Sequence, residues 1–163
     1  RQMCIRDSYY TNFTYWTQHC WGVTCVNDME AMLSYQPITI GDKEQALADL
    51  VRCYEKMMMR SHTNGGYVNL LDECWKMCEK FHTNIVIMYD HVSCKNVGGL
   101  HGLFEDQARE RGIHLIWIPH DVMDPRTVSR REMREAFSQY MVTVLNEKPL
   151  DPTLLDYEDT LSW

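Results

Sequence analysis

The chain has 163 residues, of which 45% are hydrophobic and 24% charged, and its 23 acidic and 16 basic side chains give a net charge of −7. This length can bury the core of one ordinary domain, and only 8 Gly and 5 Pro exclude collagen-like and low-complexity chains. No apolar run approaches the roughly 20 residues that cross a bilayer, and an acidic chain lacks the clustered Lys and Arg that bind nucleic acid. We therefore expect a soluble domain without a membrane or nucleic-acid partner.

The seven cysteines indicate a reducing compartment. An odd number of cysteines without a regular spacing argues against a disulfide framework, so we expect a cytoplasmic protein. In such proteins most cysteines are small buried hydrophobic residues, and fewer are metal ligands or nucleophiles. Cys74 and Cys78 would share one helical face, but no second Cys or His pair at zinc-site spacing accompanies them. We expect packing roles for five of the cysteines: Cys20, Cys25, Cys53, Cys74 and Cys78.

The first eight residues, RQMCIRDS, resemble the translated read-through of a sequencing adaptor. The segment lacks an initiator Met and any hydrophobic periodicity. We therefore leave residues 1–8 out of the expected fold, as one leaves out a cloning scar, and we expect natural upstream sequence to be missing. The remaining chain divides into an expected α/β domain at residues 9–150 and an acidic tail at residues 151–163.

The first third of the expected domain gives mixed signals. Residues 9–22 are rich in aromatic side chains and favour neither helix nor loop. A short apolar run at residues 22–26 predicts a strand, which residues 28–34 could continue as a helix. Residues 42–60 carry apolar side chains at helical spacing, with Asp42 as the expected N-cap. We expect the following stripe of this helix to face the core: Leu47, Leu50, Val51, Tyr54, Met57 and Met58.

The rest of the domain alternates between helix and strand. The expected elements are a helix at residues 67–81, a strand at 84–89, a helix that ends at Arg111 with Gly112 after it, and a strand at 114–118. The run at 84–89 is apolar on both faces, which is typical of a central parallel strand. Ser129 and Glu132 form a capping box for a last helix that runs to about residue 146. This alternation predicts an α/β fold with a three-layer flavodoxin- or Rossmann-like parallel sheet flanked by helices.

Two polar loops follow the predicted strands, and ligands gather at the carboxyl ends of the strands in such sheets. Cys94 lies in the first loop, between a strand end and a helix that opens with glycines, and Lys95 is beside it. A helix N-terminus and a nearby cation favour the thiolate, which binds metals or attacks electrophiles, although loop cysteines beside a lysine are also common without any function. We expect His91 close to such a site. The second loop carries residues that we expect to hold it together: Asp121, Asp124 and Arg126.

The residues around Cys94 resemble a known family. The C-terminal domain of the 2-hydroxyacyl-CoA dehydratase/benzoyl-CoA reductase family is similar to residues 91–141, which read HVSCKNVGGLHGLFEDQARERGIHLIWIPHDVMDPRTVSRREMREAFSQYM. The shared features are a strand that ends in a Ser-Cys-Lys turn, a Gly-containing helix, a Gly-Ile strand ending near Asp121, an Asp-Pro-Arg motif and a helix that opens at Ser129. The likeness extends over about residues 20–148 and indicates a subunit like the D-component of 2-hydroxyglutaryl-CoA dehydratase.

The resemblance implies an iron–sulfur protein that acts on acyl-CoA thioesters. In this family a subunit typically holds a 4Fe–4S cluster through three cysteines. Cys94 matches the third ligand, and the other two would lie outside this chain. His91, Ser93 and Lys95 would lie around the cluster, with Lys95 placed to face the anionic cluster or a CoA phosphate. The resemblance assigns no catalytic residue, and Val92 stands where many members have Arg, which marks a divergent subgroup.

The resemblance also implies partners and a reaction. Family members pair with a second homologous subunit, and an ATP-dependent iron–sulfur activator protein supplies one electron. That electron forms a ketyl radical on the acyl-CoA substrate, which then loses its hydroxyl group. The expected function is therefore reductive dehydration of a 2-hydroxyacyl-CoA, and we expect this chain to be inactive alone. Two alternatives stay open: ring reduction of the benzoyl-CoA reductase type, and a non-catalytic electron-transfer or structural subunit of the same fold.

Overall fold

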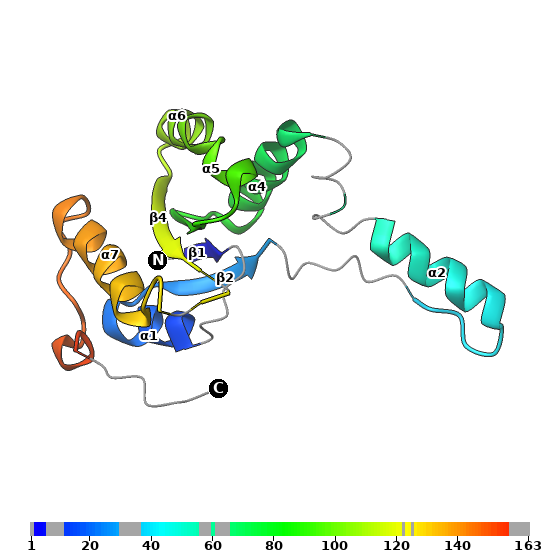
Figure 1. The fold of residues 1–163 in the computed structure, drawn as a ribbon, viewed down its shortest axis with the longest axis horizontal. Coiled ribbons are helices and arrows are strands. Elements are labelled where there is room, and N and C mark those ends of the chain that lie inside the picture. Colours follow the sequence, from blue (N-terminus) through cyan, green and yellow to red (C-terminus); the bar gives the residue numbers. More distant parts are fainter. Residues whose placement is uncertain are drawn as a thin grey trace.

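A parallel sheet forms the centre of the fold (Figure 1). The computed structural model describes residues 2–5, 12–29, 37–55, 60, 66–121, 123–124 and 126–156. The strands are β1 (Gln2–Ile5), β2 (Thr24–Asp28), β3 (Ile85–His91) and β4 (His114–His120). They lie in the order β2-β1-β3-β4, and every neighbouring pair is parallel. The predicted mixed α/β class with a parallel sheet is therefore confirmed.

The helices largely follow the local signals in the sequence. They are α1 (Asn12–Trp21), α2 (Lys43–Glu55), α4 (Tyr67–Phe81), α5 (Lys95–Gly98), α6 (His101–Arg111), α7 (Arg130–Thr143) and the short 3₁₀ turn η1 (Pro152–Leu154). The capping box at the start of α7 is confirmed, because the Ser129 side chain accepts from the Glu132 backbone and the Glu132 carboxylate accepts from the Ser129 backbone. Gly112 ends α6 in the left-handed conformation, with φ at 65°. None of the described helices is both long and apolar enough to cross a membrane.

Two hydrophobic cores lie on opposite faces of the sheet because side chains alternate along each strand. Ile85, Ile87 and Ile116 project into one core, which the buried residues of α1 and α7 complete. Val86 and Met88 project into the other core, which α4, α5 and α6 complete. The strand β3 is thus buried on both faces, as its apolar run predicted. Right-handed crossovers explain why the helices cover opposite faces. The chain crosses from β1 to β2 through α1, and it crosses in the opposite direction along the sheet from β3 to β4 through α5 and α6.

Strand β1 corrects our expectation for the start of the chain. We left residues 1–8 out of the fold, but Gln2–Ile5 pair with β2 on one side and with β3 on the other. Met3, for example, aligns with Cys25 in one ladder and with Ile85 in the other. A strand of 4 residues is too short to reveal a period in the sequence, and its pairing partners are distant in the chain. The adaptor origin of residues 1–8 stays a prediction.

Helix α1 accounts for the aromatic segment that sequence patterns left unassigned. Phe13, Trp16 and Trp21 are buried on the face of α1 that lies against the sheet and α7. Their rings surround Phe137 of α7, with centroids 5.8 Å from it for Phe13, 5.8 Å for Trp16 and 6.4 Å for Trp21. Aromatic burial of this kind supplies much of the apolar area of a small core.

The chain returns from α7 to α1. The backbone N–H of Leu150 donates to the carbonyl of Cys20 at 2.7 Å, and the indole N–H of Trp16 donates to the carbonyl of Leu154 at 2.8 Å. Gly22, just beyond α1, has a φ of 68°, and a Cβ atom there would lie 2.8 Å from the Leu150 side chain. The start of the segment that we named the acidic tail is therefore packed against α1.

The predicted core stripe of the 42–60 helix is wrong for the residues that the structure describes. Asp42 is the N-cap as expected, since its carboxylate accepts from the backbone N–H groups two and three residues further on at 3.0 and 3.1 Å. The apolar side chains of α2 are exposed, however: Leu47, Leu50, Val51 and Tyr54. Met57 and Met58 lie outside the described residues. Helical periodicity predicts one apolar face but not that the same domain covers it, and α2 lies to one side of the sheet (Figure 1).

The aromatic cluster around Phe137 provides a test of the core. Phe137→Ala should lower the free energy of unfolding by about 3–5 kcal/mol, because it leaves a cavity beneath the rings of α1. Urea denaturation followed by circular dichroism measures this change. Val142→Ala, at an exposed position of the same helix, is the matched control and should change stability by no more than roughly 0.5 kcal/mol. Equal effects of the two substitutions would contradict the packing described here.

Candidate functional site

The loops after β3 and β4 lie side by side at the carboxyl end of the sheet. The backbone N–H of Val92 donates to the carbonyl of His120 at 3.1 Å, so the first loop continues beside the end of β4. The neighbouring strands β1 and β3 lead to helices on opposite faces, α1 and α5. Ligands of open α/β sheets bind preferentially where the chain reverses in this way. The turn after β3 is therefore the place where a ligand site is expected.

Cys94 closes a tight turn at this position. The backbone N–H of Cys94 donates to the carbonyl of His91 at 2.8 Å. The carbonyl of Cys94 accepts from the N–H of Gly98 at 3.1 Å, and this is the first hydrogen bond of α5. The Ser93 N–H donates to Nδ1 of His91 at 3.0 Å. Two consecutive backbone donors thus converge on His91. Ser93 and Lys95 are exposed on either side of Cys94, which is half-buried.

His91 belongs to a cluster of polar and aromatic side chains at the ends of β3 and β4. Since Nδ1 accepts from the backbone, the proton of the neutral ring lies on Nε2, which is 3.9 Å from Oδ1 of Asp121. The rings of His91 and His120 meet edge to face, with centroids 6.0 Å apart. The ring of His120 is buried and lies 5.0 Å from that of Tyr89. This cluster continues the core beneath α1 and α7, to which Tyr89 belongs.

The structure places the predicted site residues in one turn but does not bring all of their side chains together. Cys94 packs against the core formed with α4, α5 and α6. His91 joins the cluster on the other face of the sheet, with Tyr89 and His120. The link between His91 and Cys94 is therefore made by the backbone of the turn. His91 is placed to hold the turn, and Cys94 is presented separately.

The loop after β4 is held by its own acidic side chains, as the sequence predicted. Oδ1 of Asp121 accepts from the backbone N–H groups of Met123 and Asp124 at 2.9 and 3.2 Å. These two hydrogen bonds, a further one from Thr127 and the nearby His91 hold the pKa of Asp121 below its usual range. Asp124 and Arg126 form an exposed ion pair at 2.7 Å. Each of these contacts fixes the loop rather than a ligand.

Sequence reasoning missed a second group at the carboxyl end of the sheet. Nε2 of His101, in the first turn of α6, is 3.4 Å from Oδ1 of Asp90 at the end of β3. The imidazole ring stacks on the indole of Trp117 with centroids 3.6 Å apart and planes 19° apart. The alternation of side chains along β3 could have predicted the position of Asp90, because Asp90 follows Val86 and Met88 on the face that packs against α4 and α6. This group lies on the same face of the sheet as Cys94.

The described residues do not by themselves fit a 4Fe–4S cluster. They contain no group of three or more His, Cys, Asp or Glu side chains that could hold a metal ion. Cys94 supplies one thiolate, whereas the cluster of the resembling family needs three. Of the remaining described cysteines, Cys20, Cys74 and Cys78 are buried in the two cores, which confirms their predicted packing role. Burial, aided by the charge of Asp151, raises the pKa of the Cys20 thiol to about 11, so this thiol stays protonated at neutral pH.

Comparison of the chain with family models, with curated proteins and with solved structures finds no match. Parallel α/β sheets host many unrelated chemistries, so the fold alone does not define an activity. Any functional assignment therefore depends on the residues at the carboxyl end of the sheet and on the family resemblance of residues 91–141.

The lowered pKa of Asp121 predicts how the stability of the fold depends on pH. A carboxylate of this kind stabilises the fold above its unfolded pKa of about 3.9, and the contribution is lost as the pH falls through the lower folded value. Asp121→Asn should therefore reduce stability at neutral pH and flatten the loss of stability below about pH 4. Urea denaturation at a series of pH values measures both effects.

Asp72→Asn is the matched control for this prediction, because Asp72 is exposed on α4 away from the loop. The control should keep the acid dependence of the unchanged chain. If Asp121→Asn also kept it, the loop would not depend on the Asp121 carboxylate.

Proposed function

We propose that this chain is part of a subunit of an iron–sulfur enzyme of the 2-hydroxyacyl-CoA dehydratase/benzoyl-CoA reductase type. The proposed activity is reductive dehydration of a 2-hydroxyacyl-CoA thioester, with Cys94 as one ligand of a 4Fe–4S cluster. The sequence of residues 91–141 supports the proposal through its ordered motifs, from the Ser-Cys-Lys turn to the helix that opens at Ser129. The cluster would supply the electron-transfer chemistry once the remaining ligands are present.

One observation carries the proposal: Cys94 follows the carboxyl end of β3. The neighbouring strand β1 connects to β2 on one side, whereas β3 connects to β4 on the other side, so Cys94 lies where the strand order reverses. A cysteine elsewhere in the fold would have no such position. The strand order β2-β1-β3-β4, with cores on both faces, agrees with the flavodoxin-like order and supports a three-layer arrangement. A crevice at the carboxyl end of β1 and β3 is where such sheets bind ligands.

In this proposal the residues beside Cys94 orient it. His91 is a positioning residue, because its carbonyl and Nδ1 accept the backbone N–H groups of Cys94 and Ser93. Asp121 lies 3.9 Å from the other ring nitrogen and so limits rotation of the imidazole. Lys95 is exposed next to Cys94 and offers a positive charge to an anionic cluster or to a CoA phosphate.

The proposal requires partners outside the described residues. Two further cysteine ligands and most contacts to the acyl-CoA substrate would come from additional sequence of the same subunit and from a second homologous subunit. An ATP-dependent iron–sulfur activator protein would deliver the electron. We place the assembly in the cytoplasm, where a reducing environment keeps the six cysteines from Cys20 to Cys94 as free thiols.

A non-catalytic subunit of the same fold is the second candidate. The observation that favours it is the packing of Cys94 against the core beneath α4 and α6, which is also how a purely structural cysteine behaves. Such a subunit would keep the turn and the sheet without binding a cluster at Cys94. Iron content therefore separates the two candidates.

Cys94→Ser should remove most of the iron and acid-labile sulfide from the complete subunit, because a hydroxyl group is a poor ligand for iron–sulfur clusters. The subunit is expressed and purified without oxygen together with its partner, and iron is measured per polypeptide. Cys53→Ser, at a half-buried position on α2, is the control and should leave the iron content unchanged. Unchanged iron in Cys94→Ser would favour the structural role and exclude the proposed ligand.

The 163-residue chain alone should fold but hold no complete cluster, because its described residues include no group of three ligands. Anaerobic reconstitution with iron and sulfide, followed by absorption and electron paramagnetic resonance spectroscopy, tests this expectation. A stoichiometric 4Fe–4S spectrum from the chain alone would show that the ligands we assign to other segments are present here.

A further inference from the structure

The group formed by Asp90, His101 and Trp117 holds one imidazole ring from two sides. Oδ1 of Asp90 lies 3.4 Å from Nε2 of His101. The indole of Trp117 stacks on the imidazole, with centroids 3.6 Å apart and planes 19° apart. The carboxylate therefore sets which ring nitrogen faces the protein, and the indole sets the plane of the ring.

The contact with Asp90 determines the tautomer of His101. An ionised carboxylate only accepts hydrogen bonds, so the ring nitrogen beside it carries the proton. In the neutral ring Nε2 is then the donor, and Nδ1 is the acceptor. Nε2 is buried, and its distance to Asp90 is long for a hydrogen bond. Contacts of this kind at proton-transfer sites often tighten only when the ligand is bound.

Nδ1 of His101 is open to a partner. Within the described part of the chain, the polar and ring contacts of His101 are those with Asp90 and Trp117, and no hydrogen bond reaches Nδ1. The side chain of His101 is 33% exposed and that of Asp90 is 41% exposed, so a solute can reach the pair. The charged residues on the same helices are Lys95 of α5 and Glu105, one turn further along α6, and both are exposed.

The group lies at the same end and on the same face of the sheet as Cys94. Trp117 and Cys94 both pack against the core that α4, α5 and α6 form on β3. Helix α5 begins directly after Cys94, and only residues 99–100 separate it from α6, which begins at His101. The proposed cluster ligand and the imidazole are therefore carried by one short helical segment.

We propose that His101 is the proton-transfer residue of the dehydration and that Asp90 is its positioning residue; this inference rests on the proposed function. When the substrate hydroxyl leaves, the C–O bond breaks, its electron pair stays on oxygen, and Nδ1 of the imidazolium supplies the proton that completes water. Nδ1 then takes the proton that dehydration removes from the adjacent carbon, and the electron pair of that C–H bond enters the new double bond. One water is formed for each double bond, and the imidazolium is restored.

The surroundings of His101 suit both of its charge states. In the charged state the ring lies over an indole face and its Nε2–H faces a carboxylate, and both contacts stabilise a cation. In the neutral state Nδ1 is the basic atom. Two other histidines at this end of the sheet lack this combination, since Nδ1 of His91 already accepts from the Ser93 N–H and the ring of His120 is buried.

The test is dehydration by the complete complex, purified without oxygen and supplied with its activator. The probe substrates are 2-hydroxyglutaryl-CoA, with an acidic acyl group, and 2-hydroxy-4-methylpentanoyl-CoA, with an apolar one. His101→Gln should lower kcat by about 10²–10⁴-fold and abolish the loss of activity that the unchanged complex shows toward alkaline pH. Asp90→Asn should move that loss to lower pH, because the imidazolium loses its carboxylate partner.

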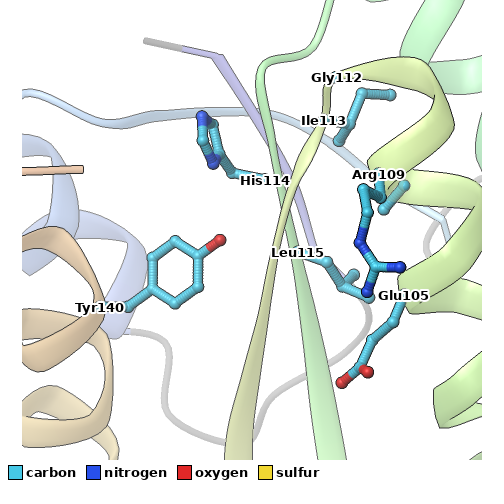
Figure 2. A pocket seen from close by; sticks show the side chains of 8 residues that line it. Glu105, Arg109, Gly112, Ile113, His114, Leu115 and Tyr140 are labelled. Atoms are coloured by element: carbon cyan, nitrogen blue, oxygen red, sulfur yellow. The ribbon is translucent and has the colours of Figure 1, made fainter. Parts of the chain in front are cut away.

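His114→Gln is the matched control. His114 lies at the opposite end of β4, where it lines a pocket of about 380 Å³ together with Tyr140 and Arg109 (Figure 2). The control removes the same chemical group and should change neither kcat nor the pH profile. Iron per polypeptide should stay unchanged in all three variants, because the proposal gives none of these residues a role in holding iron.

A second measurement does not depend on activity. In the 163-residue chain labelled with ¹⁵N-histidine, long-range NMR correlations distinguish the two imidazole tautomers, and the His101→Gln spectrum assigns the signal. His101 should carry its proton on Nε2 at alkaline pH, and Asp90→Asn should increase the Nδ1–H form. A predominant Nδ1–H form in the unchanged chain would contradict the proposed arrangement.

The remaining outcomes separate this inference from the proposed function. If the complex dehydrates either substrate and His101→Gln leaves kcat and the pH profile unchanged, the proposed function stands and His101 has no part in it. Loss of iron in His101→Gln would show that the residue maintains the structure rather than moving a proton. A complex that holds its cluster but dehydrates neither substrate would refute the proposed function and this inference with it.

Discussion

The parallel ladder between β3 and β4 is the interaction on which the other features depend. Its register runs from Ile85 opposite His114 to His91 opposite His120, so the two strands end at the same level. This shared level makes the Cys94 turn and the Asp121 loop neighbours. The same ladder buries β3 on both faces and keeps the two cores apart. A slip of one residue would exchange the faces of every side chain and dismantle both cores together.

Elements with strong local signals could be predicted from the sequence. The capping box of α7, the glycine that ends α6 and the doubly buried β3 are fixed by residues close to one another in the chain. Strand β1 could not be predicted, because its identity depends on pairing with β2 and β3 rather than on its own residues. The apolar stripe of α2 correctly predicted a helix, but the predicted burial of that stripe was wrong, because periodicity does not indicate what covers a helix face. The finer three-layer arrangement stays a prediction that the two cores support.

For the candidate site, the sequence located the turn but not the directions of its side chains. Alternation along a strand predicts which face Asp90 occupies, yet it stops at the turn, where backbone angles decide where Cys94 points. His91 and Cys94 therefore seemed to form one site and instead join different cores. Contacts that cross between strands and helices, such as His101 on Trp117, depend on the register of β4 and the placement of α6 together. Only the folded chain supplies both.

The hydrogen bond from Trp16 to Leu154 joins residues 138 positions apart and so closes almost the whole described chain into a loop. During synthesis the aromatic face of α1 leaves the ribosome long before the segment that covers it. The aromatic face of α1 therefore stays partly uncovered in the nascent chain until residues 150–154 have emerged. Truncation within residues 150–154 should therefore lower the yield of folded protein.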